Sequence, residues 1–449
     1  MDILTFFTCF ETLATRTGCR QLAVVAQAML SLTGRITKLS LSRWANKGGS
    51  YRTINRLFAA RLNWAEILVK FFQTHLFNPT DEYILAGDET VISKSGRETF
   101  GIDRFFSGLQ SQVIKGLSFF VFSLVNVRER KSYPLLVKQI IRSPAEKQAA
   151  RERKTKRAKK SKSQQQEQRP GRRKGSLNKN REELNLSAEL LRINSLLSLL
   201  LKLMRVFVRV KYLALDGHFG HHQAVLMARA NGLHLISKLR KDAALFEKYT
   251  GQYSGRGARK KYGEKLHYEK LPSAYLKKSE SQAECLTRFY QGIFLSKSFG
   301  SRLNVVIIEK TNKKSGKVGR AVLFSSDLEL SSEKMVEYYG LRFQIEFNFR
   351  DAKQHFGLED FMTRTEMGVA NAANVSFLMV NLSAKLLAES GGKCVGINDL
   401  KSQFRGVKYA LETIKLVEPK AEGILIEKVK EAMSQIGSIH RHNFSVSSA

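Results

Sequence analysis

The order of the apolar segments between residues 187 and 240 points to one class of fold. Residues 187–207 form an apolar-rich stretch with helical periodicity, and residues 211–215 have the composition of a short buried strand. A second helix is predicted at 221–232, where a glycine caps its end, and a second strand follows at 233–240. This alternation predicts a mixed sheet with helices on its faces.

Strands are also predicted on both sides of this unit. Residues 81–93, 111–127 and 131–141 are β-rich and are separated by Gly, Arg and Ser turns, so we interpret them as three strands. Residues 246–327 contain a basic loop followed by further β-like runs. We interpret that region as an inserted β-rich subdomain.

The first 80 residues have a helical pattern instead. Four helical segments are predicted, with Ser50 as the N-cap of the segment at 51–62. Basic residues on these segments are compatible with a helix-turn-helix DNA reader, and a plain helical bundle fits the same pattern.

The net charge of +35 points to an anionic partner, with nucleic acid as the first expectation and a membrane surface as the second. Residues 147–181 contain 15 Lys and Arg and 2 Glu, so the rest of the chain is basic as well. The wider segment 143–182 is too polar and repetitive to pack, and we interpret it as a flexible excursion. It is either a solvated loop or a loop that also holds backbone phosphates, for example through a minor-groove hook at Arg172, Arg173 and Lys174.

Several classes of protein are excluded by simple patterns. The longest apolar runs fall well short of the ~20 residues that a membrane span needs. The N-terminal stretch has acidic residues and no basic region, which argues against a secretory signal. The four cysteines are scattered without a CxxC pair, so a reducing cytoplasm and no cysteine zinc site are expected. No GxxxxGK[ST] motif is present, and ATP dependence is not implied.

Three acidic residues stand at positions suited to chemistry. Asp88 ends the apolar run YILAGD and Asp216 ends YLALDG, so each carboxylate is predicted at a strand end, where a sheet offers its ligand crevice. An Asp at such a place is also a common turn former. Glu346 lies on a predicted neighbouring helix. Together the three carboxylates would hold two Mg²⁺ ions, or Mn²⁺ in their place, beside a phosphate.

The helix around Glu346 carries a polar stripe. At ~100° per residue, Tyr339, Arg342, Glu346, Arg350 and Lys353 fall on one narrow face, next to an apolar face that docks the helix. In one interpretation the stripe is exposed, and Arg342 and Glu346 form an ordinary i,i+4 ion pair. In the other, the Tyr, Arg and Lys side chains bind phosphate beside the carboxylate.

Residues Tyr339, Arg342, Glu346 and Lys353 match a Tyr-x2-Arg-x3-Glu-x6-Lys signature at every spacing. The chain resembles a DDE transposase of bacterial insertion sequences, in the branch that carries this signature, over about residues 80 to 390. The resemblance implies a ribonuclease H-like core and a metal-binding role for Asp88, Asp216 and Glu346. It also implies a β-rich insertion between the second and third acids, which are 130 residues apart in this chain.

One departure from that family concerns base stacking. Better-known relatives stack a flipped base on a Trp of the insertion while a DNA hairpin forms, whereas both Trp residues of this chain lie in the N-terminal helices. Four aromatic residues of the insertion are candidates to replace it, and packing in a β core is the alternative for them. These residues are Phe289, Tyr290, Phe294 and Phe299.

Two clusters near these motifs have competing interpretations. The histidines at 218, 221 and 222 have a spacing that zinc sites use, but no cysteine or second acid completes a tetrahedral set, so phosphate contact or helix capping is the alternative. The segment SGRGARKKYG is interpreted as a basic hairpin near DNA rather than as a nucleotide-binding loop. Its DNA contacts are expected from Arg256, Arg259, Lys260 and Lys261.

The resulting hypothesis is a transposase that binds terminal inverted repeats, cleaves the ends of an insertion sequence with Mg²⁺ and joins the 3′ ends to target DNA. A homodimer on double-stranded DNA is expected, in the bacterial cytoplasm near the nucleoid and without a membrane or ATP. Two alternatives stay open. One is a metal-dependent nuclease of the same core without strand transfer, and the other is a basic DNA-binding protein without chemistry.

The predicted fold class is α/β, with a ribonuclease H-like mixed-sheet core, a β-rich insertion and helical regions at both ends. At 449 residues, 43% of them hydrophobic, the chain can fill two or three cores. The predicted boundaries are a DNA-binding domain at 1–80, a catalytic core at 81–245 and 328–365, an insertion at 246–327, and a C-terminal region at 366–449 that dimerises around residues 371–390.

Overall fold

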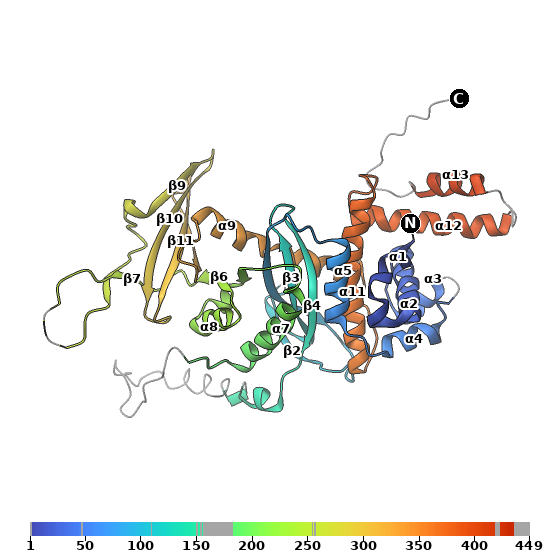
Figure 1. The fold of residues 1–449 in the computed structure, drawn as a ribbon, viewed down its shortest axis with the longest axis horizontal. Helices are drawn as coiled ribbons and strands as arrows, with labels where there is room; N and C mark the ends of the chain where they lie inside the picture. The colour runs from blue at the N-terminus through green and yellow to red at the C-terminus, as the bar shows by residue number, and fades with distance from the viewer. Residues whose placement is uncertain are drawn as a thin grey trace.

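The computed structural model describes residues 2–45, 48–108, 110–149, 151–152, 155, 183–253, 255, 257–417 and 423–434. Four residues that were expected to bind DNA lie outside the described residues. These are Arg172, Arg173, Lys174 and Arg256. The molecule is elongated, with a strand-rich end and a helix-rich end (Figure 1).

One mixed sheet runs through most of the molecule. Within the described ranges it has 12 strands, in the order β2-β3-β1-β5-β6-β12-β11-β10-β7-β8, with β4 paired to β3 and β9 paired to β10. The strands are β1 (Tyr83–Ser93), β2 (Asp103–Ser107), β3 (Gln112–Asn126), β4 (Lys131–Ile140), β5 (Tyr212–Leu215), β6 (His234–Leu239), β7 (Leu245–Lys248), β8 (Tyr262–Lys265), β9 (Leu276–Ser281), β10 (Cys285–Ser296), β11 (Arg302–Asn312) and β12 (Val318–Ser325).

The prediction of three strands between residues 81 and 141 was one too few. β2 is a short fourth strand that pairs antiparallel with the start of β3. It lies in a stretch rich in Gly, Arg and Ser, which has no strand periodicity, and its stability comes from pairing and from Phe105, which is 1% exposed. Tertiary contacts therefore decide its conformation.

The strands that precede the insertion form the mixed sheet that the sequence predicts. β3 runs antiparallel between β1 and β4, while β1, β5 and β6 are parallel to one another. On β3, Phe119 and Val121 belong to one buried cluster, while Phe120 and Phe122 belong to another. Because alternate side chains of a strand point to opposite faces, both faces of this sheet are buried.

The insertion continues this sheet. β12 pairs antiparallel with β6, from Val322↔Leu239 to Ser325↔Ile236, and β11 and β10 follow outward. Phe294 of the insertion lies in the same buried cluster as the helices that cover one face of the central strands. Residues 246–327 are rich in strands, as expected, but they extend the central sheet instead of forming a separate subdomain core.

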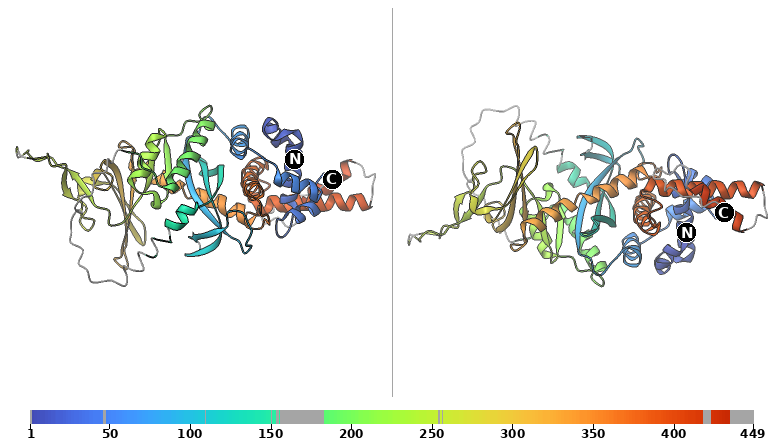
Figure 2. Two further views of the ribbon diagram at one scale, coloured as in Figure 1. Left: turned by 90° about the horizontal axis from the view of Figure 1, so that it is seen from below. Right: turned by 90° about the horizontal axis from the view of Figure 1, so that it is seen from above.

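Helices cover both faces of the central strands and fill the far end of the molecule (Figure 2). They are α1 (Ile3–Phe7), α2 (Glu11–Ser31), α3 (Lys38–Trp44), α4 (Tyr51–Ala59), α5 (Trp64–His75), α7 (Ala188–Met204), α8 (His222–Ala230), α9 (Ser332–Leu341), α10 (Gln344–Gln354), α11 (Glu366–Glu389), α12 (Ile397–Val417) and α13 (Gly423–Ser434). Ser50 caps α4 by accepting a hydrogen bond from Thr53 N at 3.3 Å, as predicted. None of the described helices is long and apolar enough to cross a membrane.

Asn371 on α11 joins the N-terminal helices to the C-terminal half of the chain. Its Oδ1 accepts a hydrogen bond from Trp64 Nε1 at 2.7 Å, and its Nδ2 donates to the carbonyl oxygens of Phe58 at 2.9 Å and Ala60 at 2.8 Å. The residue is 1% exposed. The helices before residue 76 therefore share a core with α11.

Residues 371–390, which were expected around a dimer interface, are largely buried within the chain itself. Phe377, Leu378 and Leu382 on this stretch are at most 1% exposed. They pack in one buried cluster with α2, α4 and α5 of the same chain. Ala384 and Leu387 on the same helix are only partly buried and line an open cavity, and the homodimer stays a prediction.

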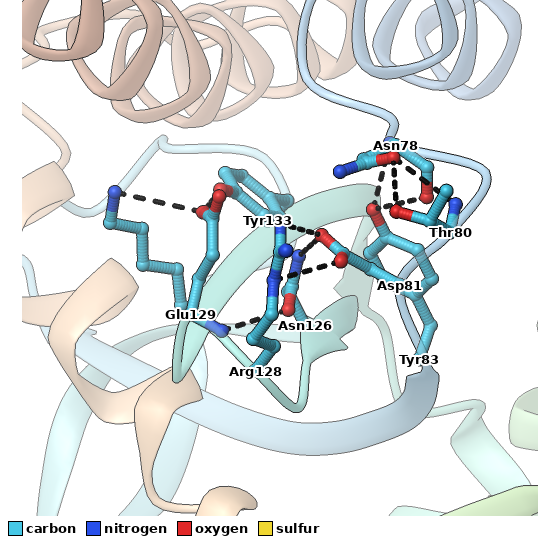
Figure 3. A network of polar contacts seen from close by, with 9 residues as sticks. Asn78, Thr80, Asp81, Tyr83, Asn126, Arg128, Glu129 and Tyr133 are labelled. Atoms are coloured by element: carbon cyan, nitrogen blue, oxygen red, sulfur yellow. Dashed lines mark hydrogen bonds and ion pairs between the residues drawn. The ribbon is translucent and has the colours of Figure 1, made fainter.

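The start of β1 is fixed by a polar network around Asp81 (Figure 3). Asp81 Oδ2 accepts a hydrogen bond from Asn126 Nδ2 at 2.7 Å, and Asp81 Oδ1 forms an ion pair with Arg128 Nε at 2.9 Å. The Asp81 side chain is 1% exposed. The turn between β3 and β4 is thereby attached to the strand that carries Asp88.

Candidate active site

Asp88 and Asp216 lie at neighbouring positions of two parallel strands. β1 and β5 are in register at Gly87↔Leu215, and each Asp is the next residue of its chain segment. Because neighbouring strands lie ~4.8 Å apart, the two acids are side by side on the sheet.

The prediction that both acids end a strand is right for Asp216 and wrong for Asp88. β5 ends at Leu215, whereas β1 continues to Ser93 because it pairs with β3 along its whole length. Asp88 therefore lies in mid-strand, at the level where its parallel neighbour stops. Asp216 Oδ1 accepts a hydrogen bond from His218 N at 3.0 Å and so caps the short turn that follows β5.

The single helix predicted from Tyr339 to Lys353 is broken into two. α9 ends at Leu341 and α10 begins at Gln344. The backbone hydrogen bonds between them span three residues, as from Glu346 N to Phe343 O at 3.0 Å. Leu341 packs in the cluster beneath β5 and β6, while Ile345 packs in the cluster of the N-terminal helices. The two halves dock on different cores, which bends the stripe at Arg342.

Arg342 lies between the acids. Its Nη1 donates a hydrogen bond to Asp88 Oδ2 at 2.6 Å, and its Nη2 lies 3.4 Å from Glu346 Oε1. The exposed fraction is 13% for the Arg342 side chain, 22% for Asp88 and 42% for Glu346. The i,i+4 pair of the first interpretation is present, but Arg342 also bridges to a strand, so the stripe is not an ordinary exposed face.

Burial and charge both shift the pKa values of these groups. Burial raises the pKa of Asp88 to about 6 against the opposing effect of Arg342, and the charges of Asp216 and Glu346 raise it further. Burial alone would lower the pKa of Arg342, but Asp88, Glu346 and Asp216 act on it together and the pKa is raised. All three acids therefore act electrostatically on one guanidinium.

The donor set suits a divalent cation, although its present arrangement does not enclose one. Carboxylate oxygens are the ligands that Mg²⁺ and Ca²⁺ prefer. Across the described ranges, no group of three Asp, Glu, His or Cys side chains is placed to hold a metal ion. Arg342 bridges two of the acids, and its Nε is buried without a hydrogen-bond partner. In donor chemistry the residues fit a divalent cation, and in this structure Arg342 stands between two of the carboxylates.

The other residues of the stripe take different positions. Lys353 Nζ donates to the carbonyl oxygen of Val91 at 2.9 Å and so ties α10 to β1. Arg350 pairs with Asp351 at 2.9 Å, and its guanidinium lies over the Phe347 ring. Tyr339 remains near the acids: the Arg342 guanidinium lies 5.9 Å from the centre of its ring, and burial, Asp216 and Asp88 raise the pKa of its hydroxyl against the opposing effect of Arg342. Of the four proposed phosphate ligands, only Tyr339 and Arg342 stand at the acids.

One pair beside the acids was not anticipated. His218 Nε2 lies 3.3 Å from Glu189 Oε2, which comes from the first turn of α7. This hydrogen bond raises the pKa of His218. His221 and His222 stand at the start of α8. The sequence offers no signal for the pair, because Glu189 is remote in the chain and acidic residues are common in first helical turns.

Base stacking by the aromatic residues of the insertion is contradicted at three of the four positions. Tyr290, Phe294 and Phe299 are 8%, 2% and 3% exposed. Phe294 packs against Tyr275, and Phe299 packs against Phe324. Core packing, the alternative interpretation, describes these three residues, since a buried ring has no face free for a base. Phe289 is half-buried on β10.

The basic hairpin between β7 and β8 lies at the strand-rich end, remote from the acids in the order of the sheet. The Arg259 guanidinium lies 5.3 Å from the centre of the Tyr253 ring, and Lys260 Nζ lies 4.7 Å from that of Tyr249. Lys261 Nζ donates to the carbonyl oxygen of Gly300 at 2.9 Å. The structure does not bring these cations to the active site.

Comparisons with known proteins bear on the identity of this site. A family model described as DDE superfamily endonuclease matches residues 5–289, which include Asp88 and Asp216 but not Glu346. A search of the curated proteins gives no match. Among solved structures, a cryo-EM structure of the piggyBac transposase synaptic complex with hairpin DNA covers 99% of this chain and 88% of its own, at 10% identity and a TM-score of 0.43. The family match spans more than half of the chain, and the protein therefore belongs to the DDE superfamily endonucleases.

Proposed function

We propose that the protein is a transposase that binds the terminal inverted repeats of an insertion sequence, cleaves its ends and joins the 3′ ends to target DNA. The observation that carries the proposal is that Asp88 and Glu346 contact the guanidinium of Arg342, while Asp216 directly follows the strand that pairs with β1 beside Asp88. Membership of the DDE superfamily endonucleases supports phosphodiester cleavage as the reaction. The Tyr-x2-Arg-x3-Glu-x6-Lys spacing supports the bacterial insertion-sequence branch.

The strand order of the core supports a ribonuclease H-like assignment. Three antiparallel strands, β4, β3 and β1, are followed by two strands parallel to β1. The first acid is on β1, the second directly follows β5 and the third is on α10. The three carboxylates thus come from β1, from the residue that follows β5 and from α10.

Asp88, Asp216 and Glu346 would hold divalent cations, Mg²⁺ or Mn²⁺. When bound, such ions supply a charged centre that activates a water or a 3′ hydroxyl and stabilises the departing oxygen. Arg342 and Tyr339 stand where they would bind the phosphate next to the acids through charge-assisted hydrogen bonds. Lys353 holds α10 on β1 and thereby positions Glu346.

The charge distribution supports DNA as the substrate. The chain carries a net charge of +35, and Arg43, Arg52 and Arg56 are exposed on α3 and α4. We assign the recognition of the repeats to this N-terminal region and backbone contacts to the wider basic surface. Two ends are processed in one event, so the active species is a homodimer on DNA in the bacterial cytoplasm.

The test is the cleavage of a duplex that carries one terminal repeat. Asp88→Asn, Asp216→Asn and Glu346→Gln each abolish cleavage in Mg²⁺ and retain binding in Ca²⁺, because each removes one carboxylate and little volume. Asp351→Asn is the matched control: it removes a carboxylate of the same helix whose partner is Arg350. Full cleavage by any one of the three site variants removes that residue from the site.

A second assay separates transposition from cleavage alone. Pre-cut ends are incubated with a supercoiled target, and only a transposase yields a joined product. If the ends are cut but never joined, the protein is a nuclease of the same core.

A further inference from the structure

A basic cavity lies in the insertion, at the far left of Figure 1, where β7 and β8 meet the turn between β10 and β11. Its volume is about 430 Å³. Four of its seven lining residues are cationic and none is acidic. The lining consists of Lys248, Tyr249, Lys260, Lys261, Leu295, Ser301 and Arg302.

These cations are held in place without carboxylates. Lys261 Nζ is fixed by the Gly300 carbonyl at 2.9 Å, and Lys260 Nζ lies 4.7 Å from the centre of the Tyr249 ring. In the part of the chain that the structure describes, no ion pair joins either lysine to an acid. The nearby Glu247 is used elsewhere, since it accepts a hydrogen bond from the Tyr275 hydroxyl at 2.7 Å. The positive charge of the cavity is therefore not neutralised from within.

Ser301 adds a donor to the same cavity. Its Oγ is buried and has no hydrogen-bond partner among the described residues. An unpaired buried hydroxyl is unfavourable, and because the Oγ is closed off from solvent, the Ser301 side chain must rotate before it donates to an anionic oxygen in the cavity. A set of ammonium and guanidinium groups with one hydroxyl donor is the chemistry that binds a phosphate.

The sheet fixes how far this cavity lies from the acids. β7 is the sixth strand from β1 in the order β1-β5-β6-β12-β11-β10-β7. Arg302 begins β11, which is the fourth strand from β1, so at ~4.8 Å per strand the cavity lies roughly 19 to 29 Å from the acids across the sheet. Because B-DNA rises about 3.4 Å per base pair, a duplex that crosses the sheet places about six to nine base pairs between the two sites.

We propose that this cavity binds a phosphate of the DNA backbone about six to nine base pairs from the phosphodiester that is cut, and that this contact sets the register of the DNA end. The location of the cut bond rests on the proposed function. The cavity itself rests on Lys260, Ser301 and Arg302, which lie outside the acid site.

The test measures the binding of two duplexes in Ca²⁺, without cleavage. One carries 20 base pairs of the terminal repeat and the other is a hairpin-capped duplex of its outermost 4 base pairs, which at about 3.4 Å per base pair is too short to reach the cavity. Lys260→Gln with Arg302→Gln is expected to weaken binding of the long duplex about tenfold in 0.1 M salt and to leave the short duplex unchanged. For the long duplex, the slope of the logarithm of the binding constant against the logarithm of the salt concentration is expected to decrease by about the amount of one phosphate contact.

The matched control removes two charges from the turn between β11 and β12, at Lys313 and Lys314. Lys314 is paired with Glu284 at 2.7 Å, so this turn already has a carboxylate partner. Lys313→Gln with Lys314→Gln is expected to change the affinity for either duplex less than threefold. Ser301→Ala keeps every charge and is expected to weaken only the long duplex, by about threefold.

Equal losses on the two duplexes, or equal losses for the cavity and control variants, would overturn the inference, because both describe diffuse attraction without a site. Unchanged binding of the long duplex by the cavity variant would overturn it too. Failure of the proposed function is a separate result. It would appear as DNA cleavage by Asp88→Asn in Mg²⁺, a measurement that does not depend on how the cavity variants bind the duplexes in Ca²⁺.

Discussion

Replacement of Arg342 by Gln is predicted to tighten divalent metal binding in the absence of DNA. A cation that enters the site must first separate the guanidinium from Asp88 and Glu346, which lie 2.6 and 3.4 Å from it. Two unit charges 4 Å apart attract each other by about 4 kcal/mol at an effective dielectric of 20. Solvent screens the half-exposed Glu346 pair to about 0.5 kcal/mol, and the better buried Asp88 pair retains about 2–3 kcal/mol. Loss of the guanidinium therefore lowers the Kd by about 100-fold, since 1.4 kcal/mol is a factor of ten.

The assay is the titration of DNA-free protein with Mn²⁺ at pH 8, followed by the decrease of the free-ion EPR signal. This pH lies above the pKa of about 6 that Asp88 has in the wild type, and it is chosen high because loss of Arg342 raises that pKa further. Arg350→Gln is the matched control, since it removes the same charge about two turns further along, on α10, where its partner is Asp351. Equal Mn²⁺ affinities for wild type and Arg342→Gln would refute the reasoning, as would an equal gain for Arg350→Gln.

Three further predictions concern the fold. Asn371→Ala lowers the free energy of unfolding in urea by about 3 kcal/mol, because it leaves the Trp64 indole N–H and backbone carbonyls unpaired in a buried position; an effect below about 1 kcal/mol would contradict the joint core. Phe294→Ala costs about 3–5 kcal/mol in the same assay, whereas Phe294→Leu costs less and leaves the cleavage products unchanged; a selective loss of one cleavage product in Phe294→Leu would restore a stacking role. Burial lowers the pKa of Lys401 to about 8, so its ammonium disfavours the folded state at pH 7 and this penalty disappears as pH rises from 8 to 10.5. Lys401→Met therefore stabilises the protein at pH 7 by at most about 3 kcal/mol and by little at pH 10, and a gain independent of pH would contradict the charge argument.

The elements with strong local patterns could be predicted from the sequence. The apolar runs that contain Asp88 and precede Asp216 form β1 and β5, and the alternation of strands and helices between residues 187 and 240 predicted the mixed sheet to which they belong. Ser50 caps α4 as its position before an amphipathic segment indicated. In each case residues close in the chain determine the structure, so a short window carries the information.

The features that were missed depend on contacts between distant residues. The stripe around Glu346 bends because Leu341 and Ile345 dock on different buried clusters, which no local periodicity reveals. The aromatic residues of β10 have the composition of a stacking surface, but pairing with β11 buries Phe294. The basic cavity joins segments around Lys260 and Arg302, which come together only through the sheet.

The central claim is that the three acids share one metal site, and it can be tested by cutting the protein at that site. Fe²⁺ takes the place of Mg²⁺ at oxygen-rich sites, and with ascorbate and peroxide it produces hydroxyl radicals that cleave the backbone beside the bound ion. With a terminal-repeat duplex present, the account predicts cleavage near residues 88, 216 and 346 together, suppressed by excess Mg²⁺ and lost in Asp88→Asn. Cleavage near one of the three positions alone, or at positions unaffected by Mg²⁺, would contradict it.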